Sequence, residues 1–252
     1  MQKDETMLQK RFVELSKIAY QREIVTYSDF LNLNELNILH TTPKQDLYVC
    51  YETFGGYECS ERQMVAFLPD ALCCYNKEYP ISVLKIEPMQ KKFAEELSHR
   101  DYLGAILNLG IERSKIGDIL VQSDSAIMFV HKSLERFIAD ELTRIRHTSV
   151  IVRNVEGEQW FYQPKMREIK GTVSSLRLDS LISLAFSTSR SKLVSYIENG
   201  KVFVNGKLIT SNGYQIKEND IISVRGLGRF QFKELISKTK KERLYVTIDL
   251  YI

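Results

Sequence analysis

The order of strand and helix patterns between residues 81 and 155 narrows the possible folds more than any other feature of the chain. Short apolar runs predict four strands at 81–87, 117–121, 126–131 and 149–155, and apolar residues at helical spacing predict helices over 98–109 and 134–145. Strand, helix, strand, strand, helix, strand is the order of a split β-α-β, or ferredoxin-like, sandwich. We therefore predict a ferredoxin-like (βαββαβ) middle domain over residues 79–158.

Local signals in this segment support the same assignment. Ser98 and Asp101 have the spacing of a capping box at the start of the first helix, and Gly110 lies where that helix should end. RNA-recognition motifs share this order of elements, but they carry stacking aromatic residues and a basic-glycine signature in the third strand. The third strand here, SAIMFVH, has neither feature. If this domain binds RNA, we expect it to do so in another way.

The residues on either side complete the body of the chain. Helical spacing over 5–20 and 34–40, with strand patterns at 47–53 and 63–68, predicts an N-terminal α/β domain over 1–78. Gly55-Gly56 between those strands is interpreted as a turn, with close approach to an RNA backbone as the alternative. Residues 159–171 contain Pro164 and no clear period, which indicates a linker to a C-terminal domain over 172–252.

The C-terminal domain begins with two short amphipathic helices and a hairpin. Apolar side chains at helical spacing mark the helices, at Leu178, Leu181, Ile182 and Ala185 and then at Leu193, Val194 and Ile197. Ser187, Thr188 and Ser189 supply hydroxyl groups that could cap the second helix, and Gly200 should end it. Asn205-Gly206 between apolar runs is the strongest short hairpin signal. The whole chain is thus predicted to be an α+β multidomain protein.

Positive side chains gather where these two helices begin. Arg177 precedes the first helix, and Arg190 and Lys192 lie in the first turn of the second, which has no acidic residue. A cation at a helix N-terminus is unfavourable by about 0.3–1 kcal/mol, because the helix dipole is positive there. An anion such as RNA phosphate would reverse that cost. We interpret these residues as phosphate ligands without protein counter-ions; the alternative is that they are solvated surface residues.

The charge distribution favours a polyanionic partner for the C-terminal domain. Residues 172–252 contain 13 basic and 7 acidic residues, whereas residues 1–171 contain 22 and 25. The net charge of +3 therefore combines a basic module with a slightly acidic body. The excess is too small for a protein that coats nucleic acid without selectivity.

The C-terminal pattern resembles the S4 RNA-binding domain. The resemblance rests on Arg177-Leu178-Asp179, Ser189-Arg190, the run from Ile197 through Gly200 to Asn205-Gly206-Lys207, and Asp220-Ile221-Ile222, and it covers most of the last ~80 residues. It implies an αL-type helix pair with a small β-sheet, and helix-start arginines that hold structured rRNA or tRNA. The RNA-binding residues we predict on this basis are Arg177, Arg190, Lys192, Lys201, Asn205, Lys207, Arg225 and Arg229. Lys238, Lys240, Lys241 and Arg243 form a second basic cluster, for which a solvated loop is the alternative.

A second resemblance spans nearly the whole chain. The segment HRDYLGAILNLGIERSKIGDI, together with GGYECSER, GRFQFKE and TKKER, resembles the YlmH family of bacterial S4-domain proteins. Membership implies a cytoplasmic, ribosome-associated protein that binds rRNA and tRNA. The implied site is the large subunit carrying peptidyl-tRNA, in quality control or rescue of stalled translation.

The alternative function is an RNA-modifying enzyme, such as a pseudouridine synthase, that uses S4 as an anchor. The one Arg-Leu-Asp sequence, at 177–179, falls inside the S4 pattern, and no synthetase-like His-Ile-Gly-His loop is present. We therefore expect no enzymatic activity and no cofactor. The four cysteines and four histidines lack zinc-site spacing, so no metal is expected. Without a long apolar run or an apolar leader, we expect a cytoplasmic monomer that does not enter a membrane.

Overall fold

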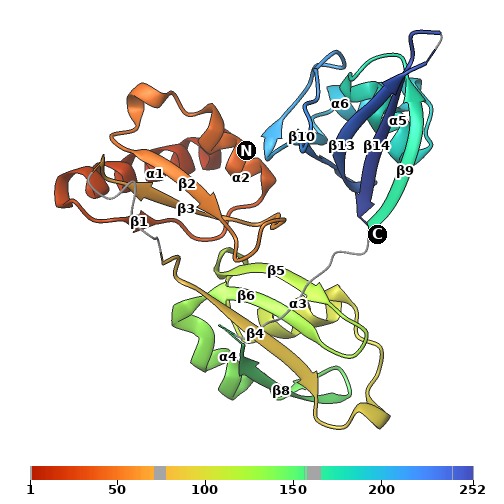
Figure 1. The fold of residues 1–252 in the computed structure, drawn as a ribbon. Helices are drawn as coiled ribbons and strands as arrows, with labels where there is room; N and C mark the ends of the chain where they lie inside the picture. Colours follow the sequence, from red (N-terminus) through yellow and green to blue (C-terminus); the bar gives the residue numbers. More distant parts are fainter. Residues whose placement is uncertain (1, 71–77, 156, 158–165, 240, 252) are drawn as a thin grey trace. The chain divides into compact units, whose positions relative to one another are not determined.

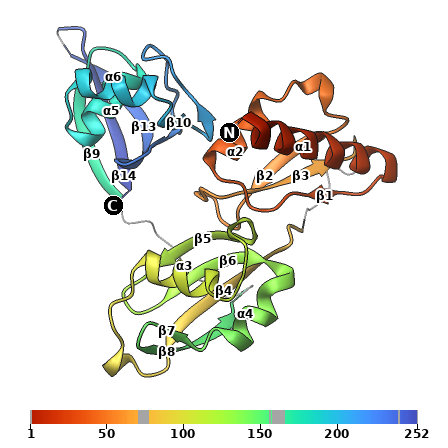
Figure 2. The ribbon, with the colours of Figure 1, turned by 180° about the vertical axis from the view of Figure 1, so that it is seen from behind.

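The protein folds as two compact units, Met1–Tyr162 and Gln163–Ile252. The computed structural model describes residues 2–70, 78–155, 157, 166–239 and 241–251 (Figure 1). Unit 1 contains two antiparallel sheets and unit 2 contains one, and helices pack on each sheet, as Figure 2 shows from the opposite side. The predicted combination of helices and several sheets in a multidomain α+β chain is confirmed.

The first part of unit 1 is a small α/β layer. Its elements are α1 (Gln2–Arg22), β1 (Thr26–Tyr27), α2 (Leu33–Thr41), β2 (Cys50–Phe54) and β3 (Met64–Leu68). The three strands form an antiparallel sheet in the order β1-β3-β2. Phe12 of α1 packs on Phe67 of β3, with ring centres 6.3 Å apart. The predicted N-terminal α/β region is confirmed.

The second part of unit 1 has the predicted ferredoxin-like topology. Its elements are β4 (Ile81–Pro88), α3 (His99–Leu107), β5 (Ile116–Val121), β6 (Ala126–His131), α4 (Glu135–Glu141), β7 (Arg144–Ile145) and β8 (Thr148–Asn154). The antiparallel strand order is β5-β6-β4-β8-β7. The first four strands in this order are arranged as in a split β-α-β sandwich. The predicted capping box is present, because the Asp101 carboxylate accepts hydrogen bonds from the Ser98 amide and hydroxyl groups.

One helix in this domain is shorter than its pattern suggests. We predicted a helix over 134–145, but α4 ends at Glu141. Arg144 and Ile145 instead pair with Ser149 and Thr148 in a two-residue hairpin. Arg146 has a φ of 53°, a left-handed conformation that reverses the chain there. Ile145 is buried in the hairpin, so its apolar side chain extended the helical pattern without belonging to the helix.

Two apolar clusters cover the two faces of the ferredoxin-like sheet. Both helices pack on one face, where Tyr102, Ile106 and Ile138 join the buried residues of the strands. On the other face, Phe129 of β6 belongs to a cluster that also contains Phe30 and Met64 from the N-terminal part. The regions 1–78 and 79–158, which we predicted as separate domains, therefore pack together within one compact unit.

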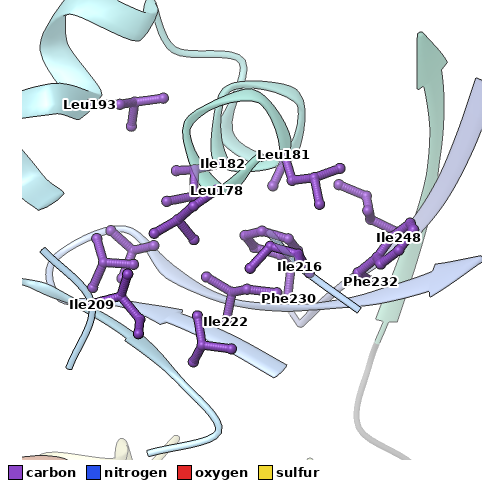
Figure 3. Packing of buried hydrophobic residues seen from close by; sticks show 14 of the residues in the cluster. Leu178, Leu181, Ile182, Leu193, Ile209, Ile216, Ile222, Phe230, Phe232 and Ile248 are labelled. Atoms are coloured by element: carbon purple, nitrogen blue, oxygen red, sulfur yellow. The ribbon is translucent and has the colours of Figure 1, made fainter. Parts of the chain in front are cut away.

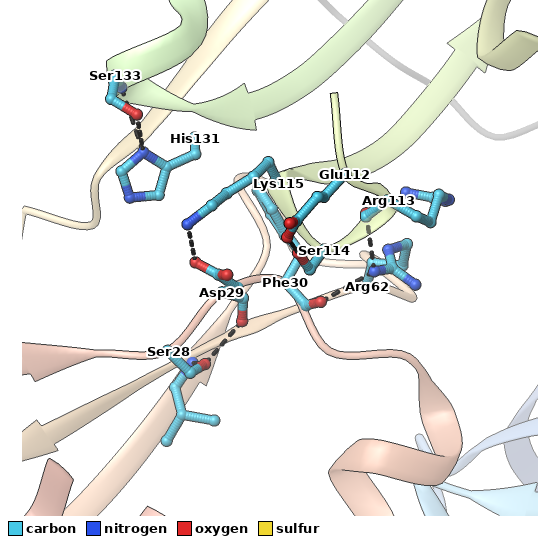
Figure 4. Close-up of polar contacts among 11 residues, drawn as sticks. Ser28, Asp29, Phe30, Arg62, Glu112, Arg113, Ser114, Lys115, His131 and Ser133 are labelled. Atoms are coloured by element: carbon cyan, nitrogen blue, oxygen red, sulfur yellow. Dashed lines mark hydrogen bonds and ion pairs between the residues drawn. The ribbon is translucent and has the colours of Figure 1, made fainter. Parts of the chain in front are cut away.

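Polar contacts reinforce this junction (Figure 4). The buried Arg62 guanidinium donates to the carbonyl oxygens of Phe30 and Ile116, both at 2.9 Å, and of Arg113 at 3.2 Å. Lys115 forms a 2.6 Å ion pair with Asp29. The segments GGYECSER and LGIERSKIGDI, which carry the YlmH resemblance outside S4, meet at this junction.

Unit 2 combines a helix pair with a six-stranded antiparallel sheet. Its elements are β9 (Met166–Val173), α5 (Leu178–Phe186), α6 (Arg190–Glu198), β10 (Val202–Val204), β11 (Lys207–Leu208), β12 (Ile221–Val224), β13 (Gly228–Lys238) and β14 (Leu244–Tyr251). The strand order is β11-β10-β12-β13-β14-β9. Leu178, Leu181 and Ile182 of α5 are fully buried against Ile222, Phe230 and Phe232 of the sheet (Figure 3). Burial of each such side chain contributes about 1.5–3 kcal/mol.

The predicted linker is partly a strand. Residues 166–171 of the predicted 159–171 linker lie in β9, which pairs with β14 residue by residue from Met166 to Val173. β9 is an edge strand with mostly exposed side chains, so it lacks the apolar alternation by which a half-buried strand is recognised. Residues 159–165 lie outside the described part of the chain.

The predicted turns in unit 2 are confirmed. Asn205 and Gly206 have φ values of 48° and 78°, as a two-residue type I′ hairpin requires. Gly200 ends α6 with a φ of 67°. Asn219 takes a left-handed φ of 68° before β12, which an asparagine tolerates better than most residues.

Candidate nucleic-acid interface

Arg177 forms an ion pair that the sequence pattern did not predict. It occupies the N-cap position of α5, and its Nε lies 3.2 Å from Oδ1 of Asp179. The carboxylate is 10% exposed and the Arg177 side chain 44% exposed. The expectation that Arg177 lacks a protein counter-ion is therefore wrong. The half-exposed guanidinium has five N–H donors, so it retains donors for a further acceptor.

The first turn of α6 is left electropositive. The helix begins at Arg190, whose side chain lies outside the described part of the structure. Ser189 occupies the N-cap position, but its hydroxyl lies 3.3 Å from the Ser191 hydroxyl and caps no backbone amide. The prediction of a capping oxygen from Ser187, Thr188 or Ser189 is wrong in this respect. With no acidic residue in the turn, its amide groups lack an anionic side chain of their own.

Three exposed lysines lie along α6 and the neighbouring hairpin. Lys192 and Tyr196 are four residues apart on one face of α6, and the Lys201 ammonium lies 5.3 Å from the centre of the Tyr196 ring. Lys207 lies on the edge strand β11 and pairs with Val204 of β10. The Leu208 methyl groups come within 3.8 Å of where a Cβ on Gly200 would stand, so this strand lies beside the end of α6. We call Lys192, Lys201 and Lys207 the lysine face.

The lysine face has no carboxylate partner in the described part of the chain. Among the described residues, Lys192, Lys201 and Lys207 form no ion pair, and each side chain is exposed. By contrast, Lys233 on the same sheet pairs with Asp249 at 3.0 Å and Lys170 pairs with Glu168 at 2.8 Å. Protein carboxylates thus neutralise other lysines of the sheet and leave the lysine face available to an external anion.

The structure places Arg225 and Arg229 on the other face of the sheet. Arg225 lies over the Phe203 ring at 5.2 Å, and Arg229 lies over the Tyr251 ring at 4.3 Å. Phe203 alternates with Val202 and Val204, which face the helices, so its side chain points away from them. Of the predicted RNA-binding residues, Arg225 and Arg229 therefore lie on the side of the sheet that faces away from α5 and α6.

Asn205 has a structural role in the hairpin. Its amide nitrogen donates to Asp220 at 2.8 Å, and its amide oxygen accepts from the Ile221 backbone at 2.9 Å. These bonds tie the β10–β11 turn to the start of β12. The second basic cluster is likewise divided: Arg243 donates to the Thr172 carbonyl at 2.8 Å, Lys238 and Lys241 are exposed, and Lys240 lies outside the described residues.

Two family models match the chain. The model described as "Putative RNA-binding domain in YlmH" matches residues 75–159, and the S4 domain model matches residues 176–222. Both matches agree with the predicted resemblance to the YlmH family of bacterial S4-domain proteins. The long strands β9, β13 and β14 lie outside the matched S4 residues, so they extend the sheet beyond that module.

Two named proteins are similar to this chain. The chain is 28% identical over 249 residues to the "Ribosome-associated protein quality control protein P2" of Bacillus subtilis, covering 98% of this chain and 95% of that protein. A solved structure, the cell division protein YlmH from Streptococcus pneumoniae, is 25% identical with a TM-score of 0.49, covering 60% of this chain and 90% of that one.

Other kinds of site lack support in the described residues. No group of three or more histidine, cysteine, aspartate or glutamate side chains there could hold a metal ion. No helix in the described part of the chain is long and apolar enough to cross a membrane. The descriptions of the matched families name RNA binding or the S4 domain and no enzymatic reaction.

Sequence reasoning missed the aromatic partners of the cations. Tyr196, Phe203 and Tyr251 each lie under a lysine or an arginine. The spacing of Tyr196 from Lys192 shows that the two share a helix face, but it does not show the contact of Tyr196 with Lys201, which follows the end of α6. The partner of Arg229 could not be read in this way, because Tyr251 becomes its neighbour only through strand pairing.

Proposed function

We propose that this protein is a non-catalytic RNA-binding factor that docks on structured rRNA and tRNA of the ribosome through unit 2. The observation that carries the proposal is the lysine face, which runs from Lys192 in the first turn of α6 to Lys201 and Lys207 beside the end of that helix. Within the described part of the chain its three exposed ammonium groups have no carboxylate partner, and Lys192 lies in a first turn whose N-cap residue makes no side-chain hydrogen bond to the helix amides. A phosphate chain supplies the negative charge that this surface lacks.

The contacts expected are mainly electrostatic. Arg177 and Arg190 suit bidentate contact with phosphate because the guanidinium is a planar fork, and the lysine face extends the patch as point charges. With about four to six phosphates contacted, affinity should fall steeply with salt, since each contact adds about 0.9 to the log–log slope. The half-buried Tyr196 ring beside Lys201 offers a surface on which an unpaired base could stack.

The biological setting is proposed from the relatives. The B. subtilis relative is named as a ribosome-associated quality control protein, and it aligns along nearly the whole chain. We place this protein, as a cytoplasmic monomer, on the large subunit carrying peptidyl-tRNA, in quality control or rescue of stalled translation.

Ultraviolet crosslinking in cells, followed by sequencing of the attached RNA, tests this proposal. We expect enrichment of large-subunit rRNA and tRNA, and loss of that enrichment in a variant with Lys192, Lys201 and Lys207 all changed to Ala. Crosslinks that are spread over messenger RNA, or that persist in the variant, would contradict the proposal. Incubation of the pure protein with rRNA should produce no modified nucleosides; turnover would favour the RNA-modifying enzyme.

A further inference from the structure

The sheet of the ferredoxin-like domain cannot present a stacking surface to RNA. Its helix-free face is covered within unit 1, where the fully buried Phe129 of β6 stacks on Tyr57 with ring centres 5.0 Å apart. RNA-recognition motifs use this face of the sheet to stack bases. A domain that matches an RNA-binding family must therefore use a different surface if it contacts RNA.

A pocket of about 480 Å³ opens on the other side of this domain, between α3 and the β7 hairpin. Three arginines from separate positions in the fold line it: Arg100 in the first turn of α3, Arg144 in β7, and Arg146 in the turn that follows. Arg100 and Arg144 are exposed, and neither forms an ion pair among the described residues. Two uncompensated guanidinium groups therefore border one concave surface.

Some acidic side chains at the pocket already have hydrogen-bond or ion-pair partners. Asp101 accepts hydrogen bonds from Ser98, which lower the pKa of its carboxyl group, and it lies 3.7 Å from Arg146. Arg146 also lies 3.8 Å from Glu95. Glu141 lines the pocket on the far side of the β7 hairpin. Because Arg146 is paired with Asp101 and Glu95, the positive charges of Arg100 and Arg144 remain, with only the negative charge of Glu141 to balance them. The pocket therefore has a net positive charge.

Gly104 is the second indication that a ligand approaches here. It lies in the middle of α3 and lines the pocket. Glycine weakens a helix interior relative to alanine, so its presence there usually reflects a need for space. No protein atom lies within 4 Å of where its Cβ would stand, so protein packing does not require the glycine. Gly104 therefore leaves open space in the lining of the same pocket that Arg100 and Arg144 border.

We propose that this pocket is a second RNA-backbone site, in which Arg100 and Arg144 bind phosphates and Gly104 lets the ribose-phosphate chain approach α3 closely. The planar guanidinium group of arginine matches the geometry of phosphate. The helix surface at Gly104 lets a ribose-phosphate backbone come close, whereas the methyl group of an alanine there would keep it away. This site lies on the ferredoxin-like domain and rests on the proposed function only in taking the same class of ligand.

The decisive variant is Gly104→Ala in the full-length protein, with deproteinised large-subunit rRNA as the probe. Because alanine is the better helix former and meets no protein atom, we expect the melting temperature of unit 1 to rise by about 2–4 °C. We also expect affinity for the rRNA to fall by about fivefold or more, through lost contacts with the backbone. A more stable protein with unchanged affinity would overturn the proposal.

A charge variant provides the second arm. Arg100→Ala with Arg144→Ala should lower the slope of log affinity against log salt concentration by about 1.4–1.8, as expected for two lost phosphate contacts. The matched control is Lys132→Ala with Arg136→Ala, which removes two exposed charges of the same domain outside the pocket. Equal slopes for the two double variants would overturn the proposal.

Two further comparisons separate the possible failures. If both pocket variants bind like the wild type while the lysine-face variant loses affinity, this inference fails and the proposed function stands. If the lysine-face variant binds rRNA like the wild type, the proposed function fails. If the pocket variants weaken binding to whole large subunits but not to deproteinised rRNA, the pocket binds a ribosomal protein and the RNA assignment is overturned.

Discussion

Arg177 and Asp179 combine a structural contact with a position suited to RNA binding. The carboxylate is nearly buried, so it needs a cation or hydrogen-bond donors, and the neighbouring guanidinium supplies both. The outer part of the arginine stays exposed at the N-terminus of α5. The residue therefore contributes to the folding of unit 2 before any RNA is bound.

We expect Arg177→Ala to destabilise unit 2 by about 1 kcal/mol, because Asp179 loses its charged partner while Arg177 itself is half exposed. Urea unfolding monitored by circular dichroism measures the change. Arg177→Lys, which keeps the charge without the fork, should recover part of the stability. An Arg177→Ala protein as stable as the wild type would show that the ion pair makes no contribution.

Arg190→Ala should act on binding without affecting the fold. The first turn of α6 has no acidic residue, so removal of a cation relieves an unfavourable interaction with the helix dipole. We expect unchanged or slightly higher stability, and a salt slope for rRNA binding that is lower by about one unit. The charge-matched control is Arg136→Ala, which removes one arginine from α4 in unit 1 instead of α6 in unit 2. A large loss of stability in Arg190→Ala would instead indicate a structural role.

At the scale of elements, the turn between β2 and β3 fixes the junction within unit 1. Gly56 has a φ of 101°, and a Cβ there would stand 2.2 Å from the Phe129 ring. Tyr57, the next residue, stacks on the same ring and donates to Asp118 at 2.8 Å. The alternative that this glycine pair meets an RNA backbone is not needed, because the close approach is made by Phe129.

Gly56→Ala should therefore destabilise unit 1 by about 3 kcal/mol, from backbone strain together with overpacking against Phe129. Thermal unfolding provides the measurement. The same substitution at Gly104 is the matched control, since it meets open space and should be neutral or stabilising. Equal stability of the two variants would contradict the packing described for this turn.

Asp118→Ala tests the polar half of the junction. The carboxylate accepts hydrogen bonds from the amides of Glu61 and Arg62, at 2.7 and 3.1 Å, and from the Tyr57 hydroxyl. Loss of that acceptor should cost about 2–3 kcal/mol, because the donors are left without a partner. Tyr57→Phe removes a single bond and should cost about 1 kcal/mol. The order of the two variants in urea unfolding is the readout.

Local chemistry made many elements predictable and explains which were not. The capping box at Ser98, the hairpin at Asn205-Gly206 and the helix stop at Gly200 depend on near neighbours, so the sequence shows them directly. β9 forms by pairing with β14, which lies far along the chain, and its side-chain pattern indicates a linker. The β7 hairpin joins two very short paired segments, and its side-chain pattern indicates a helix. The Arg177–Asp179 contact and the separation of Arg225 and Arg229 from the lysine face depend on side-chain direction, which spacing alone does not give.

At the scale of the whole molecule, the chain joins a slightly acidic unit to a basic one. Residues 172–252 carry the excess of cations, and three of these cations, Lys192, Lys201 and Lys207, form the lysine face along α6 and the neighbouring hairpin. On a protein of low net charge, polyanions bind with selectivity for position, because only local groups of unpaired cations attract them. Placement on structured RNA is the function to which such a distribution is suited.

The most direct test of RNA binding through unit 2 is the salt dependence of affinity for purified large ribosomal subunits. We predict that Lys192→Ala, Lys201→Ala and Lys207→Ala combined will lower the log–log slope by about two to three units, while the urea unfolding midpoint stays unchanged. The matched control is Lys132→Ala combined with Arg136→Ala, which should keep the wild-type slope. If the triple variant and the wild type show the same slope, RNA does not bind at the lysine face.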